Sequence, residues 1–260
     1  MPKININGVG LYYEEHGQGY PVIFLHGFSS THQTWLPQIP DLSKEVRFIT
    51  YDARGHGLSD SPETAEEYSA DIVVEDLFQL LGYLEIDQAV VGGLSMGGYE
   101  SLRFYLTHPQ KVKALIIMDT GPGYKNPKAM EAWNQDREAL AKQLETKGIE
   151  AMLEEEMTEA RRAILLKQNP TGLAHMARKV VAQHDSRVIE NLSEIKVPTL
   201  LLVGESDTPF IPAAQYMAKK ITDSELIIIP KAGHSANVDN PQAFNRAVID
   251  FLGKLNLKEG

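Results

Sequence analysis

Short apolar runs alternate with amphipathic segments along most of the chain. The apolar runs, which are rich in β-branched residues and predict buried strands, are 21–25, 46–51, 89–92, 114–118, 197–203 and 225–229. The segments between them that predict helices are 68–84, 99–107, about 212–220 and about 241–252. Strands that alternate with helices predict an α/β fold with a mainly parallel sheet covered by helices on both faces.

The pattern near the N-terminus is different. Residues 3–7 and 11–15 alternate between apolar and polar positions around Gly8-Val9-Gly10, which suggests an antiparallel hairpin. Residues 35–42 predict a short helix interrupted by Pro37 and Pro40.

The strand–helix alternation stops at Gly121-Pro122-Gly123 and resumes after about Arg187. The intervening residues are charged, rich in helix formers and free of any convincing strand pattern. We therefore expect a helical lid over residues 122–187, inserted into a core of 1–121 and 188–260. The alternative is an extra helical layer packed elsewhere, but an insertion between two core strands favours the lid.

Composition narrows the possible functions. The chain has 260 residues and a formal net charge of −10, which argues against a nucleic-acid partner. It has no cysteine, so a thiolate nucleophile and a disulfide framework are excluded. No leader-like apolar run occurs at the start, and the apolar runs are too short to span a bilayer. We expect a cytoplasmic protein that acts on a small molecule, with no membrane partner and no cofactor or metal.

The stretch 89–98 carries the strongest chemical signal. It predicts a strand that must reverse into a helix through Gly93-Leu94-Ser95-Met96-Gly97. Gly93 and Gly97 stand where a Cβ would collide across so tight a turn. Such a turn would expose the Ser95 hydroxyl and place the Met96 amide at a helix N-terminus. A glycine-rich turn in an ordinary α/β protein is the alternative.

A nucleophilic serine needs a base, and His234 is the leading candidate among eight histidines. It follows the last predicted strand in a Gly-His-Ser turn, where open α/β sheets place their sites. His26 and His56 lie in turns and are interpreted as structural residues.

The base in turn needs an acid to orient it. Asp207 follows the strand 197–203 and precedes His234 by 27 residues. Asp119, after the strand 114–118, is its rival, although it could instead cap the start of the helical insertion. Asp52 also follows a strand, but Arg54 offers it a simple ion pair.

An oxyanion needs two hydrogen-bond donors, and the backbone amides of Met96 and Phe28 are the candidates. The Phe28 side chain would then line the substrate pocket, and Trp133 of the helical insertion is the second candidate for that lining.

With these residues assembled, the chain resembles the α/β-hydrolase family from about Pro21 to Leu252. The motifs that carry the resemblance are His26-Gly27-Phe28, Asp52-Ala53-Arg54-Gly55-His56-Gly57, Gly93-Leu94-Ser95-Met96-Gly97-Gly98, Asp207 and His234. The motifs are most similar to those of bacterial carboxylesterases and 3-oxoadipate enol-lactonases. The resemblance implies a Ser-His-Asp triad that hydrolyses an ester or lactone.

Other activities stay open at this point, because the family's motifs specify the fold better than the substrate. The same triad could cleave a carbon–carbon bond, act as a lyase such as the menaquinone-pathway cyclohexadiene synthase, or perform cofactor-free perhydrolysis. The chain could also be a slow-turnover ligand receptor. An exposed apolar lid face would favour the receptor, whereas a closed pocket at Ser95 would favour an enzyme.

Overall fold

A twisted sheet forms the centre of the protein in the computed structural model, which describes residues 3–257. Its strand order is β3-β5-β4-β6-β7-β8-β9. The strands are β3 (Tyr13–His16), β4 (Pro21–Leu25), β5 (Arg47–Tyr51), β6 (Ala89–Leu94), β7 (Val112–Met118), β8 (Thr199–Gly204) and β9 (Ser224–Ile229). Every neighbouring pair is parallel except β3 and β5. The predicted α/β fold with a mainly parallel sheet is therefore confirmed.

The N-terminal hairpin is shorter than the sequence predicts. Strands β1 (Ile4–Ile6) and β2 (Val9–Leu11) pair antiparallel in a small sheet of their own. The following residues leave it and form β3, which pairs with β5 through Tyr13 and Tyr51. An alternating pattern shows that a segment is a strand but does not choose its partner, so the prediction was wrong for 13–15.

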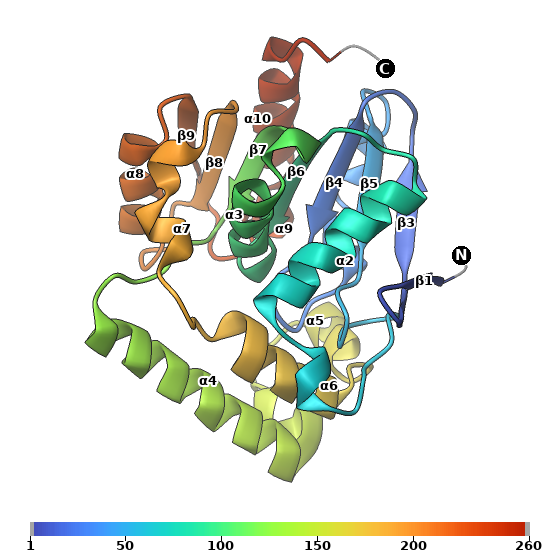
Figure 1. Ribbon diagram of the computed structural model, residues 1–260, viewed down its shortest axis with the longest axis vertical. Coiled ribbons are helices and arrows are strands. Elements are labelled where there is room, and N and C mark those ends of the chain that lie inside the picture. The colour runs from blue at the N-terminus through green and yellow to red at the C-terminus, as the bar shows by residue number, and fades with distance from the viewer. Residues whose placement is uncertain (1–2, 258–260) are drawn as a thin grey trace.

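Alternate side chains of each strand point to opposite faces of the sheet. One face, with Leu25 and Val91, packs on α2 (Ala70–Tyr83), α3 (Met96–Thr107) and α8 (Ile211–Lys220). The other face packs on η1 (His32–Trp35), α1 (Ile39–Leu42) and α10 (Pro241–Lys254). Figure 1 shows α2 and α3 in front of the sheet and α10 behind it. The shorter elements are η2 (Ala65–Glu67), η3 (Pro109–Lys111) and α9 (Ala236–Asp239).

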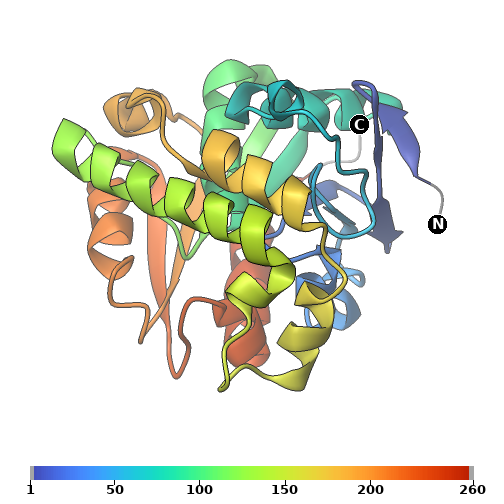
Figure 2. The ribbon, with the colours of Figure 1, turned by 90° about the horizontal axis from the view of Figure 1, so that it is seen from below.

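The chain between β7 and β8 is helical. Its elements are α4 (Pro127–Lys147), η4 (Gly148–Met152), α5 (Glu159–Leu165), α6 (Pro170–Met176), η5 (Ala177–Val181), α7 (Arg187–Glu190) and η6 (Leu192–Glu194). The first five surround a hydrophobic cluster of their own, which includes Leu144, Leu165 and Leu173. Figures 1 and 2 show α4, α5 and α6 at the end of the sheet toward which β4 points. The boundaries 122–187 of a separate lid stay a prediction.

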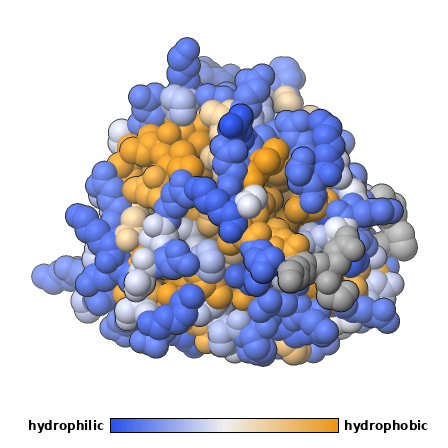
Figure 3. All heavy atoms as spheres, turned by 90° about the horizontal axis from the view of Figure 1, so that it is seen from above, coloured by the Kyte–Doolittle hydropathy of each residue, from blue (hydrophilic) through white to orange (hydrophobic). Residues whose placement is uncertain are grey.

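The opposite end of the molecule, seen in Figure 3, shows hydrophobic groups separated by hydrophilic residues. Within residues 3–257, no helix combines the length and the apolar character needed to cross a bilayer.

Candidate active site

The turn between β6 and α3 has the geometry that its glycines predict. Ser95 lies at its apex with a φ of 53°, and its amide donates to the carbonyl oxygen of Met118 at 2.8 Å. A Cβ on Gly93 would lie 2.5 Å from the carbonyl carbon of Gly97, and one on Gly97 would strike the carbonyl oxygen of Leu25. Only glycine fits either position, so these two residues hold Ser95 in its strained conformation.

Ser95, His234 and Asp207 form one hydrogen-bonded chain, although they follow three different strands. His234 Nε2 is 3.0 Å from Ser95 Oγ, and His234 Nδ1 is 2.9 Å from Asp207 Oδ2. Asp207 is buried in the turn after β8, where its amide donates to Gly204 O. His234 follows β9, and its ring packs 4.9 Å from the ring of Phe210. The structure thus brings together the three residues that the sequence singled out.

Asp119 makes a different set of contacts from Asp207. Its carboxylate accepts hydrogen bonds from the amides of Gly204 at 2.8 Å and Ala236 at 3.1 Å. It therefore links the turn after β8 with the loop that carries His234, and does not bond to the histidine. The expectation that it caps the start of the helical insertion was wrong, because no amide of that insertion within residues 3–257 donates to its carboxylate. Burial raises the pKa of Asp119 to about 6.

The expected ion pair between Asp52 and Arg54 is also absent among the described residues. Asp52 Oδ1 accepts from His32 Nδ1 at 2.9 Å, and Arg54 turns to Asp76, with Nε and Oδ2 2.6 Å apart. Burial disfavours the charged forms of both His32 and Asp52. Even so, the hydrogen bond and the charge of each partner raise the pKa of His32 and lower that of Asp52.

Two buried histidines support the loop that follows β4. His56 Nε2 accepts from the Ser29 amide at 3.0 Å, and His26 Nε2 accepts from the Ala53 amide at 3.1 Å. His26 Nδ1 donates to Gly27 O at 2.8 Å. Burial lowers the pKa of both rings, that of His56 to about 3, so both stay neutral near pH 7. They are structural, as interpreted from the sequence.

The amides of Phe28 and Met96 are free to bind an oxyanion. Neither donates to any backbone or side-chain acceptor within residues 3–257. The two backbone segments are close together, since a Cβ on Gly27 would lie 3.5 Å from Ser95 Cβ. Two unpaired N–H groups beside a nucleophile are what a tetrahedral oxyanion requires.

A cavity of about 960 Å³ opens beside Ser95 and His234. Phe28 and Trp133, the two predicted lining residues, both face it, and Trp133 Nε1 donates to Val181 O at 2.8 Å. The charged residues Glu100, Arg137 and Arg161 also line the cavity, and sequence reasoning did not single out Glu100 or Arg137. Arg137 stands four positions after Trp133 in α4, and this spacing was the available signal.

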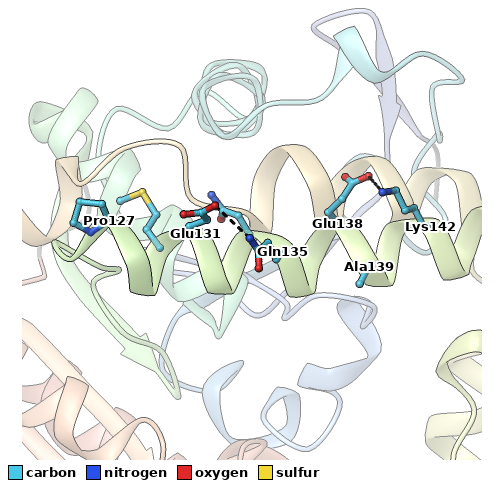
Figure 4. Close-up of a pocket in the computed structure, with 8 residues that line it drawn as sticks. Pro127, Glu131, Gln135, Glu138, Ala139 and Lys142 are labelled. Carbon is cyan, nitrogen blue, oxygen red and sulfur yellow. Dashed lines mark hydrogen bonds and ion pairs between the residues drawn. The ribbon is translucent and has the colours of Figure 1, made fainter.

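A second hollow runs along α4, away from these groups (Figure 4). Its lining includes a Glu138–Lys142 ion pair at 3.5 Å and a hydrogen bond from Gln135 to Glu131 at 3.3 Å. It holds no nucleophile, so the candidate active site is the larger cavity. Within residues 3–257, no cluster of three acidic or histidine side chains is arranged to hold a metal ion.

The fold and this site define a class of protein, and comparison with known families agrees. Residues 20–171 match the family model of the α/β-hydrolase fold. The chain belongs to the α/β-hydrolase family and is identified as a hydrolase.

Similar proteins have several activities. The chain is 31% identical over 247 residues, covering 89% of each chain, to a candidate 2-succinyl-6-hydroxy-2,4-cyclohexadiene-1-carboxylate synthase of Bacillus subtilis. It is 27% identical over 259 residues, covering 95% of each chain, to 3-oxoadipate enol-lactonase 2 of Acinetobacter baylyi. A thermophilic esterase from Thermogutta terrifontis superposes with a TM-score of 0.84 at 29% identity, covering 97% of each chain.

Proposed function

We propose that this protein is a serine hydrolase that cleaves a small carboxylic ester or lactone through an acyl-enzyme. The observation that carries the proposal is the Ser95–His234–Asp207 chain, with contacts of 3.0 Å and 2.9 Å, at the edge of a cavity of about 960 Å³. The similarity to an enol-lactonase and to an esterase supports the same substrate class.

The geometry gives each residue of the triad a role. Ser95 Oγ attacks the carbonyl carbon while His234 Nε2 takes the hydroxyl proton. Asp207 accepts a hydrogen bond from His234 Nδ1, which fixes the tautomer and stabilises the imidazolium that forms. His234 then gives the proton to the departing alkoxide. A water molecule, activated by His234 in the same way, hydrolyses the acyl-enzyme and restores Ser95.

The amides of Phe28 and Met96 bind the oxygen on which negative charge develops. The Met96 amide lies at the N-terminus of α3, where the helix dipole also favours an anion. Removing one such donor from a serine hydrolase costs on the order of a hundredfold or more in kcat.

The helices of residues 122–187 act as the lid of this site in our proposal. Their side chains supply one wall of the cavity, through Trp133 of α4, Ile164 of α5 and Val181 of η5. A wall built from helices outside the sheet can vary in sequence without disturbing the triad, and so can set the substrate preference.

The test is hydrolysis of p-nitrophenyl acetate and butyrate by the wild-type protein and by Ser95→Ala. We expect turnover by the wild type and a loss of roughly a thousandfold or more in kcat/KM for the variant. Ser186→Ala, at the start of α7 and away from the cavity, is the matched control and should retain wild-type turnover. Turnover that survives in Ser95→Ala would refute the serine mechanism.

A second candidate function has its own observation. The 31% identity to a candidate cyclohexadiene-carboxylate synthase favours a lyase that uses the same triad. In such an elimination Ser95 and His234 would take a proton from a substrate carbon, a leaving group would depart with its bonding electrons as the carbon–carbon double bond forms, and no acyl-enzyme would form. Absence of ester and lactone hydrolysis, together with formation of 2-succinyl-6-hydroxy-2,4-cyclohexadiene-1-carboxylate, would favour it over the hydrolase.

A further inference from the structure

Two arginines line the cavity without a carboxylate partner. Six of the nine arginines in the chain form ion pairs with Asp or Glu: Arg47, Arg54, Arg103, Arg178, Arg187 and Arg246. Within residues 3–257, no carboxylate oxygen lies within 4.0 Å of the Arg137 or Arg161 guanidinium. The third such arginine, Arg162, does not line the cavity. Unpaired guanidinium groups are thus concentrated at the candidate active site.

Arg137 is held in place by an aromatic ring. Its Cζ lies 4.4 Å from the centroid of Trp133, one helical turn earlier in α4, and the Trp133 indole is fixed by its bond to Val181 O. Stacking of this kind orients the planar guanidinium while leaving its N–H groups available. The Nε atom of Arg137 is buried and has no hydrogen-bond partner in the described part of the chain.

Arg161 is fixed from α5 against the loop that carries Phe28. Its two terminal nitrogens donate to the carbonyl oxygen of Ser29 at 2.8 Å and to Ser29 Oγ at 2.5 Å. Both acceptors are neutral, so the hydrogen bonds orient the guanidinium but leave its charge without a counter-ion.

Burying the Arg137 and Arg161 guanidinium charges without a counter-ion is energetically unfavourable. Burial lowers the pKa of Arg137 and of Arg161, although a guanidinium stays protonated near neutral pH. The charges of Asp136, near Arg137, and of Glu154, near Arg161, offset this burial only in part. Asp239 is bonded to the Gly233 amide, and burial raises the pKa of Glu100 to about 8. An anion bound in the cavity would offset this desolvation with strong charge-assisted hydrogen bonds.

We infer that the substrate carries a carboxylate in addition to its ester or lactone bond, and that Arg137 binds this carboxylate. Arg161 adds positive potential to the same cavity. The single guanidinium that stacks on Trp133 can bind one substrate carboxylate. This inference rests on the proposed function, because it names the substrate class of that same site.

The test compares two substrates that differ in charge: mono-p-nitrophenyl glutarate, which has a free carboxylate, and neutral p-nitrophenyl hexanoate. The measured quantity is the ratio of their kcat/KM values, which does not depend on the fraction of folded protein. We expect Arg137→Met to lower the wild-type ratio by about tenfold or more. Arg137→Lys, which keeps the charge, should lower it less. Arg162→Met, which removes an unpaired arginine outside the cavity, should leave it unchanged. An unchanged ratio in Arg137→Met would overturn the inference.

A binding measurement separates this inference from the hydrolase proposal. Trp133 and the fully buried Trp35 are the two tryptophans of the chain, so glutarate bound at Arg137 should change the fluorescence of Trp133. We expect saturable glutarate binding in the wild type and in Ser95→Ala, and its loss in Arg137→Met. Glutarate binding without any ester hydrolysis would support the carboxylate site and refute the hydrolase. Hydrolysis of both esters with equal efficiency, and no glutarate binding, would support the hydrolase and refute the carboxylate site.

Discussion

Three of the six non-glycine residues with a positive φ within residues 3–257 lie in loops at the candidate site. Ser29, Ser95 and Asp119 have φ values of 58°, 53° and 44°. Each lies in a loop that follows a strand, and each is held by hydrogen bonds or packing to a neighbouring loop. Non-glycine residues avoid this region unless the surrounding structure enforces it. The strain therefore marks the loops that hold the nucleophile, the oxyanion amides and the histidine.

Glu100 gives a prediction at the scale of one residue. It is 4% exposed, neither carboxylate oxygen has a hydrogen-bond partner within residues 3–257, and Arg103 Nε is 3.8 Å away. Burial raises its pKa from 4.5 to about 8, against the lowering effect of Arg103. Between these two values the native state holds a proton that the unfolded state has lost. The free energy of unfolding therefore falls as pH rises through this window.

We expect Glu100→Gln, which cannot ionise, to remove this pH-dependent loss of unfolding free energy. The stability of the wild type relative to Glu100→Gln should fall by roughly 1.4 kcal/mol per pH unit between about pH 6 and pH 8. Urea unfolding at both pH values measures the difference. Glu66→Gln, at an exposed position in η2, is the control and should show no such change. A constant difference between wild type and Glu100→Gln would mean that Glu100 does not hold a proton in the folded protein.

The hydrogen-bond partners of individual side chains were the hardest feature to predict. Asp52 and Arg54 are two positions apart, yet each bonds to a residue about twenty positions away. Sequence spacing reports neighbours on one element, whereas these contacts depend on how separate elements pack. The same reason explains why Arg137 was missed, because its position in the cavity depends on the placement of α4.

At the scale of elements, the strand–turn–helix unit of β6 and α3 is the most constrained part of the fold. A Cβ at Gly97 would lie 2.8 Å from the carbonyl oxygen of His26 and closer still to that of Leu25. Because backbone atoms cannot yield as a flexible side chain does, we expect Gly97→Ala to cost roughly 2–4 kcal/mol in unfolding free energy. The rate of ester hydrolysis should also fall in Gly97→Ala, since β4 and α3 position the two oxyanion amides.

The matched control is Gly82→Ala in α2, where an added Cβ meets no atom within 4 Å. This substitution should stabilise the protein by roughly 0.5–1 kcal/mol, because alanine loses less backbone entropy than glycine in a helix. Urea unfolding and ester turnover of both variants test the pair. A Gly97→Ala protein as stable and as active as the wild type would contradict the proposed steric role of this turn.

Predictions for whole elements succeeded where burial fixes the pattern. The parallel strands β4 to β8 are buried on both faces for most of their length, so they are continuous apolar runs in the sequence. β3 is half-buried throughout, and its pattern did not identify its partner. The helices 122–187 were predicted as helices, but their contacts with the cavity depend on tertiary packing.

At the scale of the whole molecule, topology explains why the triad could be predicted. The carboxyl ends of parallel strands lie at one edge of a sheet, so residues that follow β6, β8 and β9 converge there. Ser95, Asp207 and His234 were chosen for this reason, and their side chains form a hydrogen-bonded chain. The cavity wall could not be predicted in the same way, because a helical pattern does not fix the position of a helix on the sheet.

The most direct test of the account is to identify the residue that becomes acylated. Wild-type protein is mixed with p-nitrophenyl acetate, quenched rapidly in acid and digested, and its peptides are weighed by mass spectrometry. The account predicts a single acetyl group on the peptide that contains Ser95, and none on that peptide in Ser95→Ala. Ester turnover by the wild type with no acyl group on Ser95, or with the group on another residue, would contradict the proposed mechanism.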